Sequence, residues 1–111
     1  MTNANLYYLL KQTESKLNGI KNINSDSHIY TNDRIILVDA SSSDINLTIE
    51  TKKYNNYIIK KIDSSSNQVN IIPSTGLIEG ESSITLLSQY SFIEVICDGQ
   101  NWYIIGSNIY I

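Results

Sequence analysis

The sequence is poor in the residues that usually carry catalysis or cross-linking. Its 111 residues include one cysteine, one histidine, one tryptophan and one proline. A single cysteine excludes an intrachain disulfide, and Cys97 is interpreted as a small buried hydrophobic residue on a strand. His28 lies far from Cys97 in the sequence, so the chain offers no obvious nucleophile with an activating base.

Positive charge is also scarce. Lysine and arginine total 8 against 11 acidic residues, the net charge is −3, and Arg34 is the only arginine. Phosphate recognition depends on clustered basic side chains, and the pairs Lys52–Lys53 and Lys60–Lys61 are too few to follow a phosphate backbone. We therefore expect no nucleic-acid partner.

Long apolar runs are missing too. No stretch approaches the ~20 apolar residues of a membrane-spanning helix, so no membrane insertion is expected. The first five residues, Met-Thr-Asn-Ala-Asn, lack the basic start of a secretory signal, and no long apolar segment follows. We expect synthesis in a cytoplasm without a signal peptide.

Carboxylates are the remaining candidates for catalysis, because glycoside hydrolysis uses a pair of them. Most of the acidic residues fall in turn-like clusters, where aspartate caps the backbone. Glu94 lies between apolar neighbours, and a salt bridge or an exposed strand face explains it better than catalysis. We predict no catalytic residues, no metal site and no cofactor. The carboxylates considered are Asp39, Asp44, Asp63, Glu79, Glu81, Glu94 and Asp98.

What is present divides the chain into two regions. In residues 3–23, apolar or small residues recur three and four positions apart, which is typical of a short helix with a heptad-like seam. Such a helix either packs on its own domain or forms a trimeric coiled-coil stalk, and the spacing alone leaves both open. The predicted trimer seam consists of Leu6, Leu10, Thr13, Leu17 and Ile20.

From about residue 28 the pattern alternates with period two, as in strands with one buried face. Asp98–Gly99 between two apolar runs predicts a hairpin. The sequence therefore predicts an all-β head, a small antiparallel sandwich or barrel-like domain over residues 26–111, preceded by a helical stalk over residues 1–25. The expected strands cover residues 34–39, 45–49, 57–63, 68–73, 83–87, 91–98 and 101–106.

Several of these strands are apolar on both faces, for example residues 35–38, which read Ile-Ile-Leu-Val. A monomeric sandwich needs one buried face per strand. The surplus favours coverage of some outer faces by neighbouring chains.

Aromatic residues are the main candidates for recognition, because exposed tyrosine and tryptophan stack on sugars and anchor interfaces. Packing within the core is the alternative role. The candidate surface recognition residues are Tyr54, Tyr57, Tyr90 and Trp102.

Residues 34–105 carry an ordered series of short motifs. Lys60-Lys61-x-Asp63-x-Ser65-x-Asn67 is followed by Gly80, then Gln89-Tyr90, then Asp98-Gly99-x-x-Trp102. This series resembles a β module that recurs in bacteriophage tail-fibre and tail-spike proteins and in fibre-like virion proteins of large DNA viruses and their satellite viruses. The resemblance covers about two-thirds of the chain.

The resemblance implies a compact, usually trimeric β head that serves virion structure or host attachment, and it implies no catalytic residues. The expected partners are then two further copies of the chain, a virion protein bound through the N-terminal helix, and a host surface glycan or protein. Members of this group are commonly segments of longer fibres, whereas this sequence is the module plus one helix, so a minor capsid-associated or decoration protein remains an alternative. A carbohydrate-binding module without a virion role is the rival from another class, and a depolymerase is the third.

Overall fold

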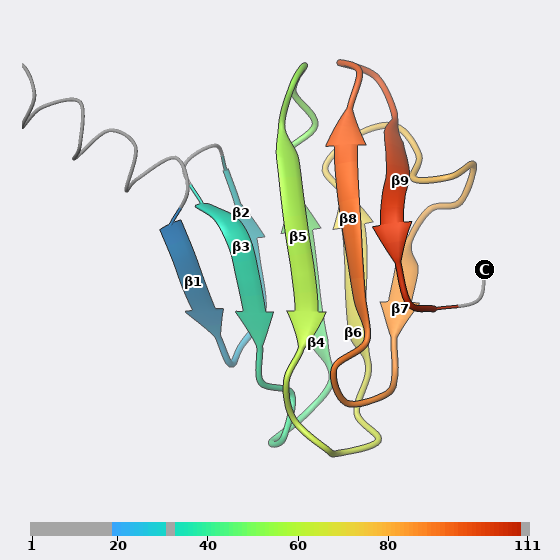
Figure 1. Cartoon of the computed structure of the whole chain (residues 1–111). Helices are drawn as coiled ribbons and strands as arrows, with labels where there is room; N and C mark the ends of the chain where they lie inside the picture. Colours follow the sequence, from blue (N-terminus) through green and yellow to red (C-terminus); the bar gives the residue numbers. More distant parts are fainter. Residues whose placement is uncertain (1–18, 31–32, 110–111) are drawn as a thin grey trace, which may run out of the picture.

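The computed structural model describes residues 19–30 and 33–109. Every regular element in these residues is a strand, and the strands form a five-stranded and a four-stranded sheet that face each other (Figure 1). The strands are β1 (Gly19–Ile23), β2 (Ser27–Ile29), β3 (Asp33–Val38), β4 (Ile45–Ile49), β5 (Asn56–Lys61), β6 (Val69–Pro73), β7 (Ile84–Leu86), β8 (Phe92–Cys97) and β9 (Trp102–Ser107). The predicted all-β class is confirmed.

The pairing of the strands differs from the predicted antiparallel arrangement. The chain alternates between the two sheets, so that β1, β3 and β5 pair in parallel in one sheet and β2, β4 and β6 pair in parallel in the other. Strands β7, β8 and β9 then add antiparallel edges, and both sheets are mixed. The antiparallel prediction is wrong because each crossover between parallel neighbours is a strand of the opposite sheet, a long-range link that local patterns do not reveal.

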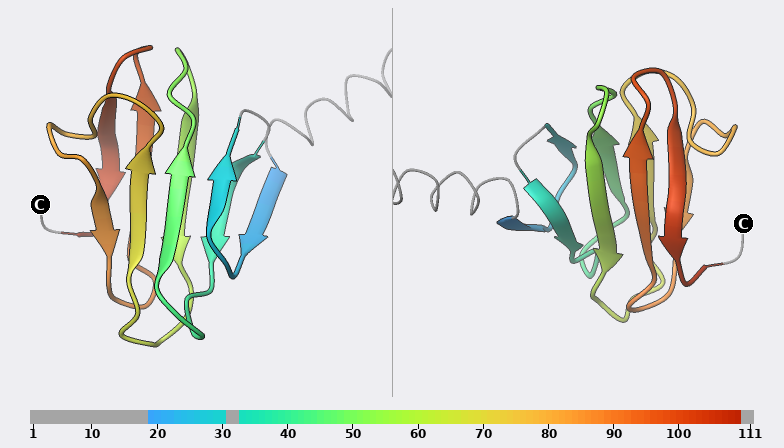
Figure 2. Two further views of the ribbon diagram at one scale, coloured as in Figure 1. Left: turned by 180° about the vertical axis from the view of Figure 1, so that it is seen from behind. Right: turned by 45° about the horizontal axis from the view of Figure 1, so that its top comes forward.

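The first three pairs of strands therefore form three stacked coils, closed at one end by the antiparallel strands. Apolar side chains stack between coils in register, as where Leu47 of β4 pairs with Ile71 of β6 and Ile36 of β3 with Ile59 of β5. These residues are fully buried. Only the inner face of β3 and of β5 is fully buried, so their near-continuous apolar runs also place apolar side chains on the outer face of the sheet. Figure 2 shows both layers from behind and from above.

The N-terminal prediction is partly corrected. The expected helix extended to residue 23, but residues 19–23 are strand β1, and Ile20 is an exposed strand residue in it. The expected boundary between stalk and head, after residue 25, falls in the turn between β1 and β2. Both of these strands belong to the sheets. The rest of the predicted helix, with Leu6, Leu10, Thr13 and Leu17, lies outside the described residues.

Strand β1 is an edge strand of the five-stranded sheet, and it carries a charged residue, Lys21. Lys21 pairs with Ile36, whose side chain is in the core, so the register places Lys21 on the inner face. Its Nζ lies 3.7 Å from Asp33 Oδ2. An inward-pointing charge on an edge strand discourages the addition of another strand.

Candidate functional site

The four aromatic residues predicted to be at the surface divide into two pairs. Tyr54 and Tyr90 are 76% and 55% exposed, which agrees with the prediction. Tyr57 and Trp102 are buried in the core, so the prediction is wrong for them. Composition shows how many aromatic residues a chain has, but the direction of each depends on its place in the alternation of its strand.

Trp102 is the largest fully buried side chain, and it links the end of the hairpin to the coils. Its ring stacks on Tyr57 with centroids 5.6 Å apart, and its Nε1 donates a 3.0 Å hydrogen bond to the Thr51 hydroxyl. Burial raises the pKa of the Tyr57 phenol, and the nearby carboxylate of Glu50 adds to this effect. Neither ring is available to a ligand.

Gln89 and Ser91, the residues on either side of Tyr90, line a shallow groove of about 400 Å³. The backbone of Tyr90 is in the left-handed region, with φ of 66°, a conformation that costs a non-glycine residue energy and is enriched at binding sites. Lys60 Nζ lies 5.7 Å from the centroid of Tyr90 and 5.5 Å from that of Phe92. The groove is lined by Thr85, Leu87, Ser88, Gln89, Ser91, Asn108 and Ile109.

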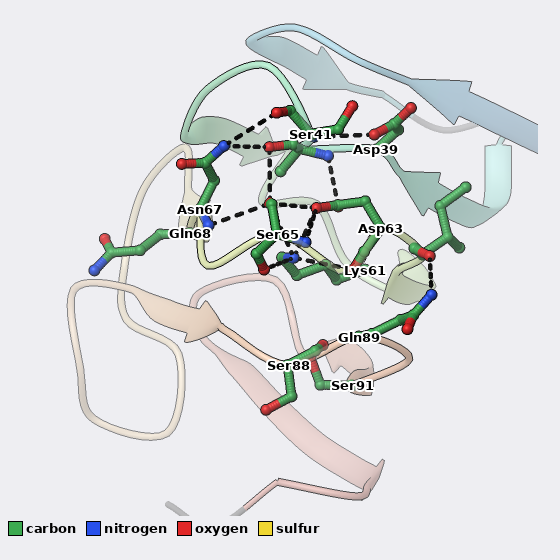
Figure 3. Close-up of polar contacts among 12 residues, drawn as sticks. Asp39, Ser41, Lys61, Asp63, Ser65, Asn67, Gln68, Ser88, Gln89 and Ser91 are labelled. Atoms are coloured by element: carbon green, nitrogen blue, oxygen red, sulfur yellow. Dashed lines mark hydrogen bonds and ion pairs between the residues drawn. The ribbon is translucent and has the colours of Figure 1, made fainter.

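The most concentrated polar network surrounds Lys61, at the end of the molecule where β3 and β5 end (Figure 3). Lys61 is fully buried, and its Nζ donates to Asp63 Oδ2 at 2.9 Å, to the Ser65 carbonyl at 2.8 Å and to the Asp63 carbonyl at 3.1 Å. Asp63 also accepts hydrogen bonds from the Ser65 hydroxyl and from the Ala40 amide, the latter at 2.7 Å. We call Lys61, Asp63, Ser65 and Asn67 the lysine network.

The lysine network ties the β3–β4 turn to the β5–β6 turn. Asn67 Nδ2 donates to the Ala40 carbonyl at 2.7 Å, and the Ser65 hydroxyl is 3.2 Å from the same oxygen. Ala40 belongs to the second coil, whereas Asn67 belongs to the third. Ser65 and Asn67 therefore hold neighbouring coils together.

The carboxylate of Asp63 is held in its ionised form. Burial alone would raise its pKa, but hydrogen bonds from Ser65, Lys61 and the Ala40 amide outweigh burial and lower the pKa well below its usual range. An open depression of about 430 Å³ adjoins the network. With both Asp63 oxygens already accepting hydrogen bonds, the carboxylate is a poor acid or base.

Five of the other six candidate carboxylates accept backbone amides or pair with a base, and the sixth, Glu81, is exposed. Oδ1 of Asp98 accepts the amides of Asn101 and Gln100 in the predicted hairpin turn, which lowers its pKa. Glu94 Oε2 is 2.9 Å from Arg34, which confirms the salt-bridge interpretation. The remaining backbone contacts run from the Ser41 amide to Asp39, from the Gln68 amide to Asp44 and from the Ile104 amide to Glu79.

Cys97 and His28 fit structural roles as well. Cys97 is a buried free thiol whose Sγ accepts the Gly99 amide at 3.3 Å. His28 Nε2 lies 3.2 Å from Glu50 Oε2, and its ring stacks on Tyr30. Residues 19–30 and 33–109 contain no group of three or more His, Cys, Asp or Glu side chains that could hold a metal ion. The same residues contain no helix with the length and apolar character of a membrane span.

Sequence reasoning missed the lysine network, although a signal for it exists. In residues 57–61 the inward positions of the alternation are Tyr57, Ile59 and Lys61. Because successive side chains of a strand point to opposite faces, one lysine of the Lys60–Lys61 pair points inward and the other outward. A buried lysine requires partners, and the following Asp63 and Ser65 provide them.

Comparison of the chain with protein-family models, with curated proteins and with solved structures gave no match.

Proposed function

We propose that this chain is the non-enzymatic β head of a homotrimeric virion fibre or spike, with a structural or host-attachment role. The observation that carries the proposal is that the residues of the fibre-like motif series build the fold. The lysine network joins two coils, Asp98 and Gly99 shape the hairpin turn, and Trp102 fills the core. A head that must survive outside a cell needs such internal bracing more than it needs a reactive cleft.

The N-terminal residues complete the proposal. The seam residues Leu6, Leu10, Thr13 and Leu17 have the spacing of a short coiled coil. Because Ile20 belongs to strand β1, the proposed stalk consists of residues before Gly19. In the assembled particle this stalk would form the trimer and contact a second virion protein.

A carbohydrate-binding module is the second candidate function, and Tyr90 favours it. An exposed tyrosine can stack on a sugar ring, and the two neighbours of Tyr90, Gln89 and Ser91, line a groove that offers hydroxyl and amide groups. Glycan binding that Tyr90→Ala abolishes, by a protein that is monomeric and missing from virus particles, would support this candidate over the virion head. Glycan binding by a trimeric virion head would instead define its attachment role.

The virion proposal is tested by the composition of purified particles. Particles of the virus that encodes the chain, washed in high salt and analysed by peptide mass spectrometry, should contain it in a constant ratio to the other structural proteins. A chain that is abundant in infected-cell lysate but missing from washed particles would contradict the proposal.

A further inference from the structure

The outer faces of the two sheets differ sharply in polarity. On the four-stranded sheet, Asn46, Asn70 and Thr85 stand side by side in register and are joined by hydrogen bonds of 3.0 and 2.8 Å. His28 and Thr48 pair on the same face. Polar groups that bond to each other and to water need no protein partner, so this face is suited to solvent.

The outer face of the five-stranded sheet is mainly apolar. One row across the sheet reads Ile20, Ile35, Ile58, and then Glu94, because these residues pair in register through β1, β3, β5 and β8. The next row reads Asn22, Leu37, Lys60 and Phe92, and a third reads Asn56, Ile96 and Tyr103. We call this surface the apolar face; its apolar members are Ile20, Ile35, Leu37, Ile58, Phe92, Ile96 and Tyr103.

Much of the apolar face is open in the single chain. Ile20 is 61% exposed, Tyr103 45% and Ile96 36%. The charged groups here already have partners: Arg34 pairs with Glu94, and Lys60 lies over two aromatic rings. The face therefore carries little unpaired charge, which favours contact with a surface of the same kind.

The size of the apolar face indicates what kind of partner fits. Strands lie ~4.8 Å apart and rise ~3.3 Å per residue, so five strands of about six residues span roughly 20 by 20 Å, or about 400 Å². A stable interface between free proteins buries about 800 Å² per partner. A face of half that size suits a partner that is already tethered, because a tether raises the effective concentration to the millimolar range.

The position of the N-terminal segment supplies that tether. The chain enters the described structure at Gly19, which begins β1, the edge strand of this same sheet. Eighteen residues precede Gly19, and they hold the proposed stalk seam. A stalk that joins three copies would bring three β1 edges, and with them three apolar faces, close together.

We propose that the apolar face packs against neighbouring copies of this chain, while the outer face of the four-stranded sheet stays in solvent. This inference rests on the proposed homotrimer and extends it, because it assigns the surface through which the heads touch. Each head would contact its neighbours through Ile58 in the middle row of the face and through Ile96 in the row nearest the β8–β9 turn. The Arg34–Glu94 pair, in or beside the middle row, would be shielded from water in the assembly.

The test uses the full-length protein with one cysteine added to either face. Ile96→Cys lies on the apolar face and Asn46→Cys on the polar face, and native Cys97 is buried and serves as the background. In a trimer, we expect a maleimide to modify Ile96→Cys at least tenfold more slowly than Asn46→Cys. In a second pair of variants, Ile58→Asp should raise the trimer dissociation constant at least tenfold, whereas Asn46→Asp should leave it unchanged.

The outcomes distinguish the packing of the apolar faces from the proposed homotrimer. A trimer in which Ile96→Cys and Asn46→Cys react equally fast would overturn the packing of the heads but leave the trimer intact. A monomer in which both react fast would overturn the trimer itself. A monomer in which Ile96→Cys alone is slow would show that the chain's own N-terminal segment covers the face. If Ile58→Asp fails to fold, the cysteine rates still decide.

Discussion

Replacing Trp102 with alanine should lower the free energy of unfolding by about 3–5 kcal/mol, the usual cost of removing a large aromatic side chain from a core. Trp102 is fully buried, stacks on Tyr57 and donates to Thr51. Three contributions are lost together: buried apolar area, the ring contact and a buried hydrogen bond. Since domains of this size have a total stability of roughly 5–15 kcal/mol, the variant should be near the limit of folding at room temperature.

Tyr54→Ala is the matched control, because it removes an aromatic side chain that is 76% exposed. Its unfolding free energy should stay within about 0.5 kcal/mol of the wild type. The measurement is urea denaturation followed by circular dichroism. Equal losses in the two variants would mean that Trp102 is not the centre of the core.

Replacing Lys61 with methionine should cost about 3–5 kcal/mol, because it removes one partner of a buried ion pair and leaves the other uncompensated. Lys61 is fully buried, and its ammonium satisfies Asp63 and the Ser65 carbonyl. Methionine has a similar length, so the loss reports the polar contacts more than a cavity. Lys52→Met, at an exposed position, is the control and should change stability by less than about 0.5 kcal/mol.

The same network predicts how stability responds to acid. The pKa of Asp63 is lowered in the folded protein, so its ionised form contributes stability above the unfolded pKa of about 3.9. That contribution is lost as the pH falls from about 5 through the lowered folded pKa. Asp63→Asn cannot titrate, so its unfolding free energy should fall less than that of the wild type between pH 5 and pH 2. A larger fall in the variant would contradict the assignment.

Much of the strand content could be predicted from the sequence, because strand existence depends on local alternation. The stretch 45–49 is predicted and observed as β4, and the Asp98–Gly99 hairpin joins β8 to β9 as expected. Strand β2 was missed because its residues, Ser-His-Ile, include only one apolar side chain and so show no alternation. Strand β1 was missed because Leu17 and Ile20 continue the helical spacing of the preceding residues, whereas residues 19–23 pair with strand β3.

The parallel pairing was beyond local patterns for a physical reason. Val38 pairs with Lys61 and Ile23 with Val38, so the coils differ in length and leave no fixed sequence repeat. The candidate surface residues show the same limit. Trp102 and Tyr103 are adjacent and both aromatic, yet one is buried and the other exposed. The alternation along β9 places the two side chains on opposite faces of the strand. Which face points into the core is decided by the pairing of β9 with β8.

The solution mass of the full-length protein tests the central claim most directly. One chain has a mass of 12.5 kDa. Light scattering coupled to size exclusion, at micromolar concentration and moderate salt, should give three times that mass. A particle of 12.5 kDa across the same concentrations would contradict the trimeric head, and with it the proposed stalk and the packing of the apolar faces.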